Sequence, residues 1–318
     1  MTLKITGTGK GIPQKSVSND ELSKFLDTSD EWITTRTGIK SRHICTHETL
    51  TDLCAEAAMQ AIGKAGISTC EVDLIICSTI AGDFRTPSLA CCVAERIGAS
   101  CPAFDINAAC TGFIYSLEVA SSLLASGKYG SILIICAEKM SAHLDWTQRD
   151  TCVLFGDGAS ACVVANGNAL RYLNIRATPD VSMLYAANGV GNSPYDTTGA
   201  RKGYVKMRGQ DVFRFAVNAA ETEISGAMAA LGITAEQIDT IILHQANKRI
   251  IEATIAKLGQ PKERFPMNID RYGNISSVSI PLMLHDMLEC GMIKRGETLF
   301  MAAFGAGLTA GSCVMVWE

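Results

Sequence analysis

The feature that most restricts the fold of this chain is an internal repeat, because three segments recur in the same order in its second half. Residues 57–78, AAMQAIGKAGISTCEVDLIICS, resemble residues 223–244, EISGAMAALGITAEQIDTIILH, 166 positions later. Residues 111–129 and 275–293 are both helical patterns ending in a glycine, Gly127 and Gly291, with a displacement of 164. Phe155 in FGDGASACVV corresponds to Phe304 in FGAGLTAGSCVMV, 149 positions later. The repeat predicts two similar halves packed about a pseudo-twofold axis.

Each half alternates short apolar runs with amphipathic segments, which is typical of βαβ units whose strands are buried on both faces. We therefore expect an α/β protein with mostly parallel sheets, in a five-layer α/β/α/β/α arrangement. The expected divisions are an N-terminal half, 1–165, a linker or inserted excursion, 166–210, and a C-terminal half, 211–318. Within the linker, the Gly-, Asn- and Thr-rich residues 187–205 indicate a surface excursion.

Composition excludes several other classes of protein. The formal net charge of -4 and pI of about 5.8 give no reason to expect a nucleic-acid partner. The chain has 13 cysteines but no C-x-x-C pair, so neither a zinc site nor a dithiol redox site is indicated. No apolar run is long enough to cross a bilayer, and the first residues lack a signal-peptide pattern. We expect a cytoplasmic protein without a membrane anchor.

The repeat also selects three chemically useful side chains. If the displacement of 164 is extended back to the helix start, Cys110 of DINAACTGF aligns with Asn274 of YGNISS. In the other repeated pair, Ser78 falls on His244, which ends the apolar strand of IILHQAN. Polar side chains at the exit of a buried parallel strand commonly form the active site of such folds. The two helix starts are expected to face each other across the pseudo-twofold axis.

A cysteine at a helix start is favoured as a thiolate, because the dipole end and unpaired N–H groups lower its pKa. The small neighbours Ala108, Ala109 and Gly112 leave room for an acyl group. Each residue also has a structural interpretation: Cys110 as a packing residue, His244 as a hydrogen-bonded core histidine, and Asn274 as a helix cap. The glycines of FGAG, Gly305 and Gly307, bring backbone N–H donors close to a ligand, as in an oxyanion hole.

Five motifs together resemble the β-ketoacyl-acyl-carrier-protein synthase III family of thiolase-fold condensing enzymes: DINAACTGF, LHQAN, YGNISS, TSDEWITTRTGI and FGAGLTAGS. The resemblance covers essentially the whole chain. It implies that Cys110, His244 and Asn274 are the catalytic residues and that an acyl-CoA and a malonyl-acyl-carrier protein are the substrates. It implies an oxyanion hole from the N–H groups of Cys110 and Ala306, and an apolar wall from Phe304. No cofactor or metal is implied.

The resemblance also assigns the path of the substrates and the partners. The CoA contacts it implies are Trp32, Arg36, Arg149 and Asn247, and the basic rim for an acidic carrier protein is Arg214, Arg249 and Lys257. A homodimer is expected, in which Thr86 of one subunit gates the acyl pocket of the other. Many family members have a phenylalanine at the position of Thr86, so acetyl specificity does not follow here. Ile275, where threonine often follows the catalytic asparagine, is expected to affect packing only.

Three alternatives stay open at this point. A close relative could use the same three residues to make a specialised metabolite with another acceptor. A cysteine hydrolase also uses Cys, His and Asn, although the duplicated halves argue against one. A non-catalytic acyl-CoA-binding protein would leave no acyl group on Cys110.

Overall fold

Two β-sheets, with helices between them and outside them, form the body of the protein. The computed structural model describes residues 3–187 and 203–318. The first sheet has the strand order β1-β7-β6-β4-β5 and the second β11-β12-β13-β8. The strands of the first sheet are β1 (Lys4–Gly11), β7 (Asp157–Ala165), β6 (Ser131–Lys139), β4 (Leu74–Ser78) and β5 (Ala103–Ile106). Those of the second are β11 (Thr240–Leu243), β12 (Thr298–Gly305), β13 (Thr309–Val316) and β8 (Leu170–Ala177).

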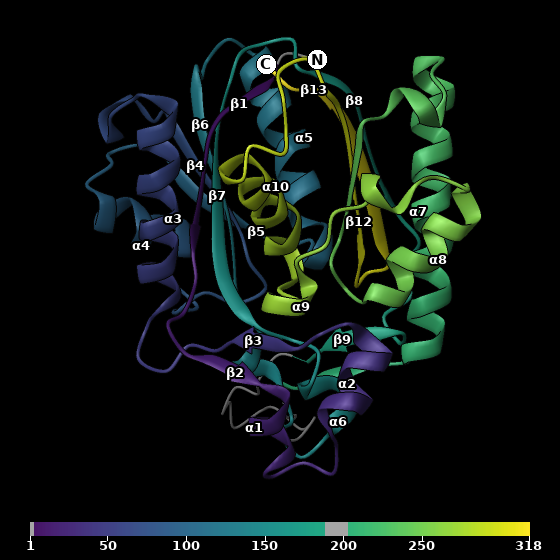
Figure 1. Ribbon diagram of the computed structural model, residues 1–318. Coiled ribbons are helices and arrows are strands. Elements are labelled where there is room, and N and C mark those ends of the chain that lie inside the picture. Colours follow the sequence, from purple (N-terminus) through teal and green to yellow (C-terminus); the bar gives the residue numbers. More distant parts are fainter. Residues whose placement is uncertain (1–2, 188–202) are drawn as a thin grey trace.

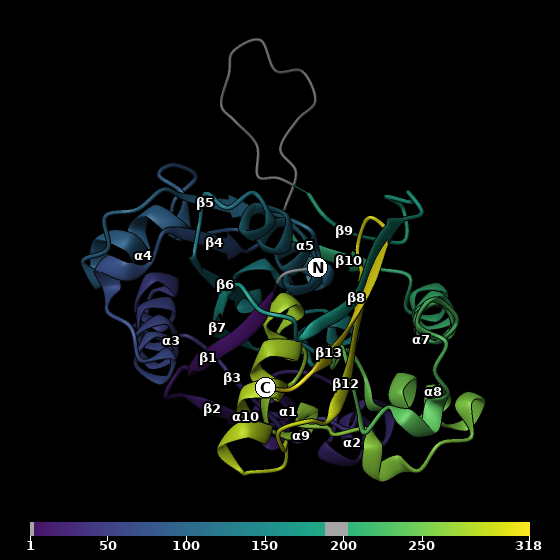
Figure 2. The same ribbon diagram turned by 90° about the horizontal axis from the view of Figure 1, so that it is seen from above.

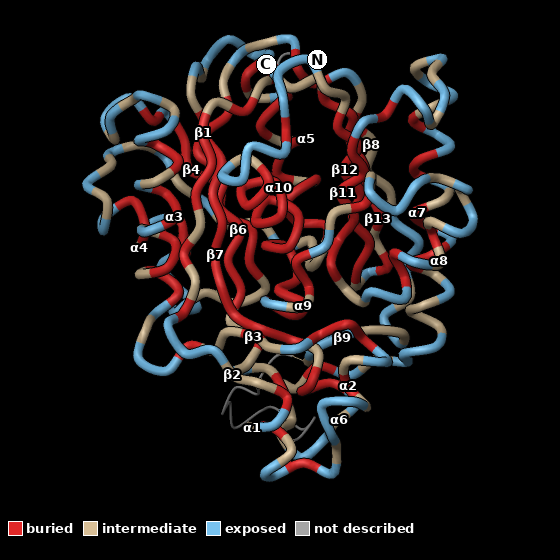
Figure 3. Tube along the Cα trace, in the orientation of Figure 1, coloured by how far each residue is buried: buried red, intermediate tan, exposed pale blue. Residues whose placement is uncertain are grey.

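The helices complete the five layers expected from the sequence (Figures 1 and 2). Two central helices, α5 (Gly112–Ala125) and α10 (Ser279–Glu289), lie between the sheets. On the outer faces lie α3 (Leu50–Ala65) and α4 (Leu89–Ile97) on one side, and α7 (Gly209–Leu231) and α8 (Lys248–Leu258) on the other. Every residue of α10 from Ser279 to Met287 is buried, and the sheets and central helices form the continuous buried interior in Figure 3. Such complete burial explains why α10 reads as apolar on nearly all sides.

The two halves correspond strand by strand. The sheet neighbours β7-β6-β4 match β13-β12-β11, and β8 takes the place of β1. The sequence repeat is confirmed at two positions. Gly66 and Gly232 both end their helices in the left-handed conformation, with φ of 69° and 64°. The Asp73 and Asp239 carboxylates both cap the neighbouring strand by accepting its N–H groups, from Ser131 and Thr298 respectively.

The register of the repeat at the helix starts differs from the one expected. Short 3₁₀ turns precede the central helices: η2 (Ala109–Thr111) before α5, and η6 (Ser276–Val278) before α10. The turn η6 begins 167 residues after η2, and α10 begins 167 residues after α5. The displacement of 164 holds only after the helices, because α10 is three residues shorter than α5. The pairing of Cys110 with Asn274 is therefore wrong: Cys110 corresponds to Ser277, and Asn274 to Asn107.

Three other expectations are corrected. Phe304 lies within β12, whereas Phe155 precedes β7, so the two are not equivalent. The sheets are mixed, with parallel pairing only at β4-β5, β4-β6 and β11-β12, because burial on both faces reports no strand direction. Residues 170–177, expected in the linker, form β8 and pair with β13. Most of the expected surface excursion, residues 188–202, lies outside the described residues.

A smaller layer lies below the sheets in Figure 1 and consists of short elements from several parts of the chain. They are β2 (Ser16–Ser18), α1 (Asn19–Ser23), α2 (Asp30–Thr37), β3 (Ser41–His43), α6 (Arg149–Cys152), β9 (Leu184–Ala186), β10 (Val205–Met207) and α9 (Ile269–Tyr272). The remaining 3₁₀ turns are η1 (Thr69–Glu71), η3 (Met140–His143), η4 (Ala235–Gln237) and η5 (Lys262–Arg264). Apolar side chains of this layer form a separate core beneath the sheets.

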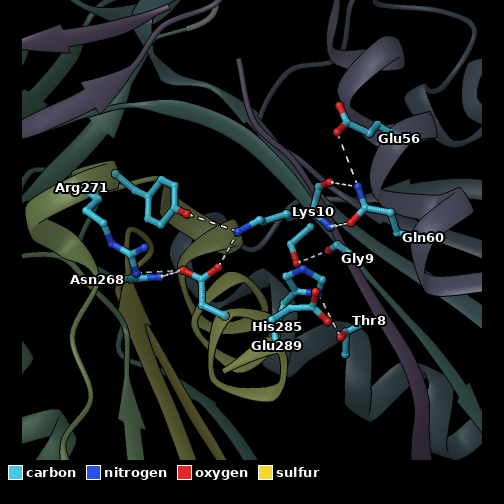
Figure 4. A network of polar contacts seen from close by, with 12 residues as sticks. Thr8, Gly9, Lys10, Glu56, Gln60, Asn268, Arg271, His285 and Glu289 are labelled. Carbon is cyan, nitrogen blue, oxygen red and sulfur yellow. Dashed lines mark hydrogen bonds and ion pairs between the residues drawn. The ribbon is translucent and has the colours of Figure 1, made fainter. Parts of the chain in front are cut away.

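A polar network ties the central helix α10 to strand β1 (Figure 4). The nearly buried Asp286 carboxylate accepts hydrogen bonds from Lys10, at 2.8 Å, Asn268, at 3.1 Å, and Arg271, at 3.2 Å. The backbone N–H of Asn268 in turn donates to the side chain of Gln245, 3.3 Å away. Because a buried carboxylate needs such partners, this network fixes the segment that follows β11 against the central layer.

Candidate active site

Three side chains far apart in the sequence line one cavity of about 920 Å³: Cys110, His244 and Asn274. Cys110 lies in η2 at the start of α5, and His244 directly follows β11. Asn274 lies between α9 and η6. The turns η2 and η6 pack against each other, so the two helix starts meet at the centre of the molecule as expected. The structure therefore brings together the three side chains that the sequence selects.

Asn274 is held in one orientation by three contacts. Its backbone N–H donates to the Leu154 carbonyl at 2.9 Å, and its own carbonyl accepts from Gly156 at 3.1 Å. Its side-chain Oδ1 accepts the N–H of Ser276 at 2.8 Å. Since Oδ1 is occupied in this way, the Nδ2 end is the part of the amide that is available to a ligand, and it is a donor.

His244 is buried and is fixed through one ring nitrogen. Its Nδ1 lies 2.5 Å from the Ser279 hydroxyl oxygen, and its backbone N–H donates to the Ala302 carbonyl. The Phe304 ring packs edge-on, with 5.7 Å between ring centroids. Desolvation lowers the pKa of His244 to about 3, so the ring is neutral at physiological pH. The Nε2 atom is the nitrogen left for a ligand in the cavity.

The Cys110 thiol does not have the lowered pKa expected from its position at a helix start. Burial raises its pKa to about 11, and a hydrogen bond from the Ser276 side chain opposes this shift only in part. Desolvation is the largest cause of the shift, since the surrounding protein excludes the water that would stabilise a thiolate. At physiological pH the group is therefore a neutral thiol, and it would have to lose its proton to act as a nucleophile.

Gly305 is the closest neighbour of Cys110 on β12. A Cβ atom placed on Gly305 would lie 2.9 Å from the Cys110 Cβ and 3.0 Å from its backbone nitrogen, too close for any side chain. The adjacent Ala306 lines a second cavity together with Cys110, and its carbonyl accepts a hydrogen bond from Thr309 at 3.0 Å. Thr309 also contacts Thr111 at 2.8 Å, which links the β12–β13 turn to the start of α5.

This second cavity lies on the other side of Cys110 and encloses about 1360 Å³. Its lining combines the segment 79–85, the residues leading into α5, and parts of the lower layer. Cys110 is among the residues that line both cavities. The thiol therefore lies where the two spaces meet, and a ligand that enters through one can place its end in the other.

The expected nucleotide contacts gather at the mouth of the first cavity. The guanidinium of Arg36 lies over the Trp32 ring at 4.8 Å, and that of Arg149 lies over the same ring at 5.0 Å. Arg149 is further held by the Asp27 carbonyl and carboxylate. Asn247 caps α8 and donates to the Arg36 carbonyl at 3.2 Å, which connects α2 to the cavity wall.

The expected basic rim is only partly assembled around this mouth. Arg214 and Arg249 line the first cavity, but Lys257, on α8, does not. Arg214 forms an ion pair with Asp211 at 2.6 Å, and Lys257 one with Glu221, also at 2.6 Å. Exposed ion pairs of this kind are weak, so their basic side chains can readily pair with an acidic partner instead.

Thr86 is exposed and precedes a cis proline, Pro87. It follows the segment that lines the second cavity but does not line the cavity of its own chain. Near it, Phe84 is 61% exposed, and Phe104 on the edge strand β5 is 37% exposed. Ile275 is fully buried, as a packing role requires.

Sequence reasoning missed the polar residues that surround the triad of Cys110, His244 and Asn274. The Ser279 hydroxyl lies 2.5 Å from His244 Nδ1, and the wholly buried Glu138 accepts a hydrogen bond from Ser277 at 2.8 Å. A signal was present in the sequence: aligning NAAC, residues 107–110, with NISS, residues 274–277, gives the displacement of 167 directly. The longer helical patterns obscured it because their lengths differ.

Two negative findings apply to residues 3–187 and 203–318. No group of three or more His, Cys, Asp or Glu side chains there could hold a metal ion. None of the helices there combines the length and apolar character needed to span a bilayer.

Comparison with known proteins gives consistent results. Residues 104–178 match the family 3-oxoacyl-[acyl-carrier-protein (ACP)] synthase III, and residues 228–317 match its C-terminal family. A β-ketoacyl-[acyl-carrier-protein] synthase III of Clostridium acetobutylicum is 43% identical over 99% of both chains. The crystal structure of 3-oxoacyl-[acyl-carrier-protein] synthase III from Aquifex aeolicus has a TM-score of 0.93 and 42% identity, covering 99% of this chain and 100% of the other.

A structure from a different pathway is also similar. The priming β-ketosynthase from the R1128 polyketide biosynthetic pathway has a TM-score of 0.93 and 30% identity, covering 99% of this chain and 96% of the other. The same fold therefore occurs in enzymes of more than one pathway.

Proposed function

Because the chain belongs to the β-ketoacyl-acyl-carrier-protein synthase III family, we propose that Cys110, His244 and Asn274 catalyse its reaction. The protein is an acyltransferase that condenses an acyl-CoA primer with malonyl-acyl-carrier protein in a decarboxylative Claisen reaction. The observation that carries the assignment of roles is that the three side chains line one cavity and that Cys110 also lines the second.

In the first half-reaction, Cys110 attacks the thioester carbonyl of the acyl-CoA and CoA leaves. The N–H groups of Cys110 and Ala306 stabilise the negative oxygen of the tetrahedral intermediate. Gly305 permits this geometry, because any side chain there would displace the cysteine. The acyl chain then occupies the second cavity, while the CoA arm lies in the first.

Entry of CoA through the first cavity is supported by its mouth. Trp32 offers a face for the adenine ring, and Arg36 and Arg149 offer charge for the phosphates. Arg149 covers the Trp32 ring here, so an adenine that stacks on that face would displace it. Asn247 lies on the wall beyond, where a pantetheine arm would pass.

In the second half-reaction, malonyl-acyl-carrier protein enters and loses carbon dioxide. Asn274 Nδ2 and His244 Nε2 donate hydrogen bonds to the thioester oxygen and stabilise the enolate that attacks the acyl-cysteine. For Nε2 to donate, the ring proton must be on Nε2 and Nδ1 must accept the Ser279 hydroxyl proton. The hydroxyl must then donate to His244 instead of to the Ser276 carbonyl, which lies 3.1 Å from its oxygen. A 2.5 Å contact to Ser279 and a neutral ring fit this role. Phe304 keeps the site apolar, which favours loss of the carboxylate as neutral carbon dioxide.

The partners follow from these roles. Arg214 and Lys257 would exchange Asp211 and Glu221 for the acidic surface of the carrier protein, and Arg249 would add its charge to the same rim. We place the enzyme in the cytoplasm with its soluble substrates, and it requires no cofactor, because side chains and backbone groups supply every step.

A homodimer fits the exposed apolar face at β5. This strand forms an edge of its sheet, and Phe84 and Phe104 stand exposed beside it. Pairing of two copies along this edge would cover both rings and bring Thr86 of one subunit to the second cavity of the other. The small Thr86 side chain then leaves room for primers longer than acetyl.

The test separates the two half-reactions. Cys110→Ala should abolish covalent labelling by radiolabelled acyl-CoA and all condensation. His244→Ala should keep the acyl label on Cys110 but lose malonyl decarboxylation by at least about 100-fold. Equal loss of both steps in His244→Ala would contradict its assigned role. Labelling that persists in Cys110→Ala would remove Cys110 as the nucleophile.

The same assays test the other functions. A panel of straight and branched acyl-CoA primers, each with malonyl-acyl-carrier protein, measures the capacity of the second cavity. Turnover only with a carrier protein of another pathway would favour a specialised-metabolism enzyme, as the similarity to the R1128 priming synthase allows. Hydrolysis faster than carbon–carbon bond formation would indicate a hydrolase, and the absence of any acyl label a binding protein.

A further inference from the structure

The two proposed donors of the decarboxylation step, His244 and Asn274, lie on separate segments of the chain. His244 directly follows β11, and Asn274 comes two residues after the short helix α9. A misplacement of about 1 Å near the reacting groups can lower a rate about 100-fold. The contacts that hold these two segments relative to each other therefore bear directly on the reaction.

One face of the central helix α10 contacts both segments. Ser279 and Asp286 are seven residues apart on α10, about two helical turns, so their side chains lie on the same face. The Ser279 hydroxyl oxygen lies 2.5 Å from His244 Nδ1. The Asp286 carboxylate accepts the side-chain N–H of Asn268 at 3.1 Å, and Asn268 directly precedes α9. Because α10 is buried along this length, it provides one rigid support for both segments.

Gln245 joins the two segments to each other. It follows His244 in the chain, its side chain is buried, and its Oε1 accepts the backbone N–H of Asn268 at 3.3 Å. Its Nε2 donates to one carbonyl on each segment, that of Leu243 at 2.8 Å and that of Pro266 at 3.4 Å. The chain of hydrogen bonds that starts at the carboxylate of α10 thus continues through Asn268 to the neighbour of His244.

The other contacts of Asp286 hold its carboxylate in place (Figure 4). It is 6% exposed and forms ion pairs with Lys10 of β1 at 2.8 Å and with Arg271 of α9 at 3.2 Å. A buried carboxylate needs such partners, because water does not reach it. Asn268 stands at the capping position of α9, but its side chain makes no capping hydrogen bond and donates to Asp286 instead. Strand β1 and the segment around α9 are therefore both fastened to α10 at one carboxylate.

The proposed nucleophile is held by different contacts. Cys110 packs against Gly305, and the adjacent Thr111 contacts Thr309 at 2.8 Å. Asp286 and the side chains bonded to it line neither cavity, so they do not touch a substrate bound there. A change at this carboxylate should therefore reach the two donors and leave the nucleophile in place.

We propose that Asp286 is a positioning residue for the decarboxylation step. Through Asn268 it fixes the segment that carries Asn274. Through the further hydrogen bond to Gln245 it fixes the segment that carries His244. The proposal rests on the proposed function and adds to it the residue that sets the position of one donor relative to the other.

The experiment measures two rates in the full-length protein. One is single-turnover acylation of Cys110 by radiolabelled acyl-CoA, and the other is release of labelled carbon dioxide from malonyl-acyl-carrier protein by the acylated enzyme. In Asp286→Asn an N–H group replaces one hydrogen-bond-accepting oxygen, so decarboxylation should fall about 30-fold. Acylation should fall less than about threefold, because the two sites share no partner.

The loss should also lie in kcat rather than in KM. Asp286 does not contact the substrate, so KM for malonyl-acyl-carrier protein should change less than about twofold while kcat carries the loss. A purely structural role would lower both rates together, because it would reduce only the fraction of folded enzyme.

An exchange of the two side chains tests the hydrogen bond itself. Asn268→Asp places two carboxylates opposite each other and should lower decarboxylation about as much as Asp286→Asn. In the double variant the amide and the carboxylate exchange places and the hydrogen bond can form again. Decarboxylation should therefore recover at least about fivefold over either single variant.

Glu223→Gln is the matched control. Glu223 lies on the outer helix α7 and is a buried carboxylate with three hydrogen-bond donors, as Asp286 is. The donors are Arg176 at 2.7 Å, Asn174 at 3.1 Å and Ser312 at 2.6 Å. This variant should leave the ratio of decarboxylation to acylation unchanged, even if its melting temperature falls.

Equal losses of acylation and decarboxylation in Asp286→Asn would overturn the proposal, as would a wild-type rate of decarboxylation or a double variant no faster than the single ones. If Asp286→Asn does not fold, Asn268→Ala decides the question, because it leaves Asp286 its two cations and keeps the backbone bond to Gln245. A selective loss of decarboxylation there supports the proposal, and its absence overturns it. If His244→Ala and Asn274→Ala instead keep wild-type decarboxylation, the proposed function fails, so the two failures are distinguishable.

Discussion

The helix start at Cys110 and its counterpart at Ser277 share a backbone and differ in the residue that faces them from the sheet. In each, an asparagine side chain accepts the N–H two residues later, Asn107 at 3.2 Å and Asn274 at 2.8 Å. In both turns the residue two positions after the asparagine has a left-handed backbone conformation, with φ of 46° at Ala109 and 47° at Ser276. The two sites are thus one local structure built twice.

The facing residues make one site open and the other closed. Gly305 faces Cys110, and its counterpart 167 residues earlier, Glu138, faces Ser277. A glycine leaves space for a thioester beside the thiol, whereas the glutamate fills that space and hydrogen-bonds the serine. Duplication therefore provides the geometry twice, and single side chains decide which copy can bind a substrate.

The strand ends differ in the same way. His244 binds Ser279 at the start of α10, and their counterparts are Ser78 and Gly112. A Cβ atom on Gly112 would lie 1.8 Å from the Ser78 hydroxyl oxygen, so this pair packs closely and leaves no room for an imidazole. The half that holds the proposed nucleophile thus lacks the proposed donors, and the other half provides them.

The largest effect is expected when the two asparagines are substituted separately and their decarboxylation rates are compared. Asn274→Ala removes a donor to the developing enolate, so decarboxylation of malonyl-acyl-carrier protein should fall about 100- to 1000-fold. Asn107→Ala removes the same local turn without a donor role and should reduce that rate less than about tenfold. Release of carbon dioxide from labelled malonyl substrate measures both. Similar losses would mean that the asparagines serve only to shape the turns.

The second largest effect is expected from adding a side chain at Gly305, beside Cys110. Gly305→Ala forces Cys110 or β12 to shift, because the added Cβ would lie 2.9 Å from the Cys110 Cβ. Acylation should fall about 100-fold, since small displacements of a nucleophile are costly. Acylation rate and thermal unfolding are measured together. A variant that acylates at the wild-type rate would show that the glycine is not what opens this site.

A smaller effect is expected from removing the hydrogen bond between Ser279 and His244. Ser279→Ala removes the hydroxyl that keeps the proton on His244 Nε2, so decarboxylation should fall about tenfold. Acylation of Cys110 should change much less, because Ser279 does not contact the thiol. Decarboxylation and acylation are assayed separately in this variant. If acylation falls more than decarboxylation, the assigned direction of this hydrogen bond is wrong.

Much of this architecture can be predicted from the sequence alone. The order of strands and helices is local, because apolar periodicity and the helix-ending glycines Gly66 and Gly232 depend only on neighbouring residues. The repeat then implies two halves and two helix starts that meet. The triad can be found from the same segments, since its members stand at the ends of repeated elements.

Only the tertiary structure decided how those elements act on one another. The unequal lengths of α5 and α10, which obscure the displacement of 167 in the longer sequence patterns, were established by the structure. The raised pKa of Cys110 depends on burial by segments that are distant in the sequence. The hydrogen bond between Glu138 and Ser277 joins positions 139 apart in the sequence, and no local pattern predicts it. Local physics thus fixes which elements form, whereas desolvation and long-range contact set the chemistry of the side chains they carry.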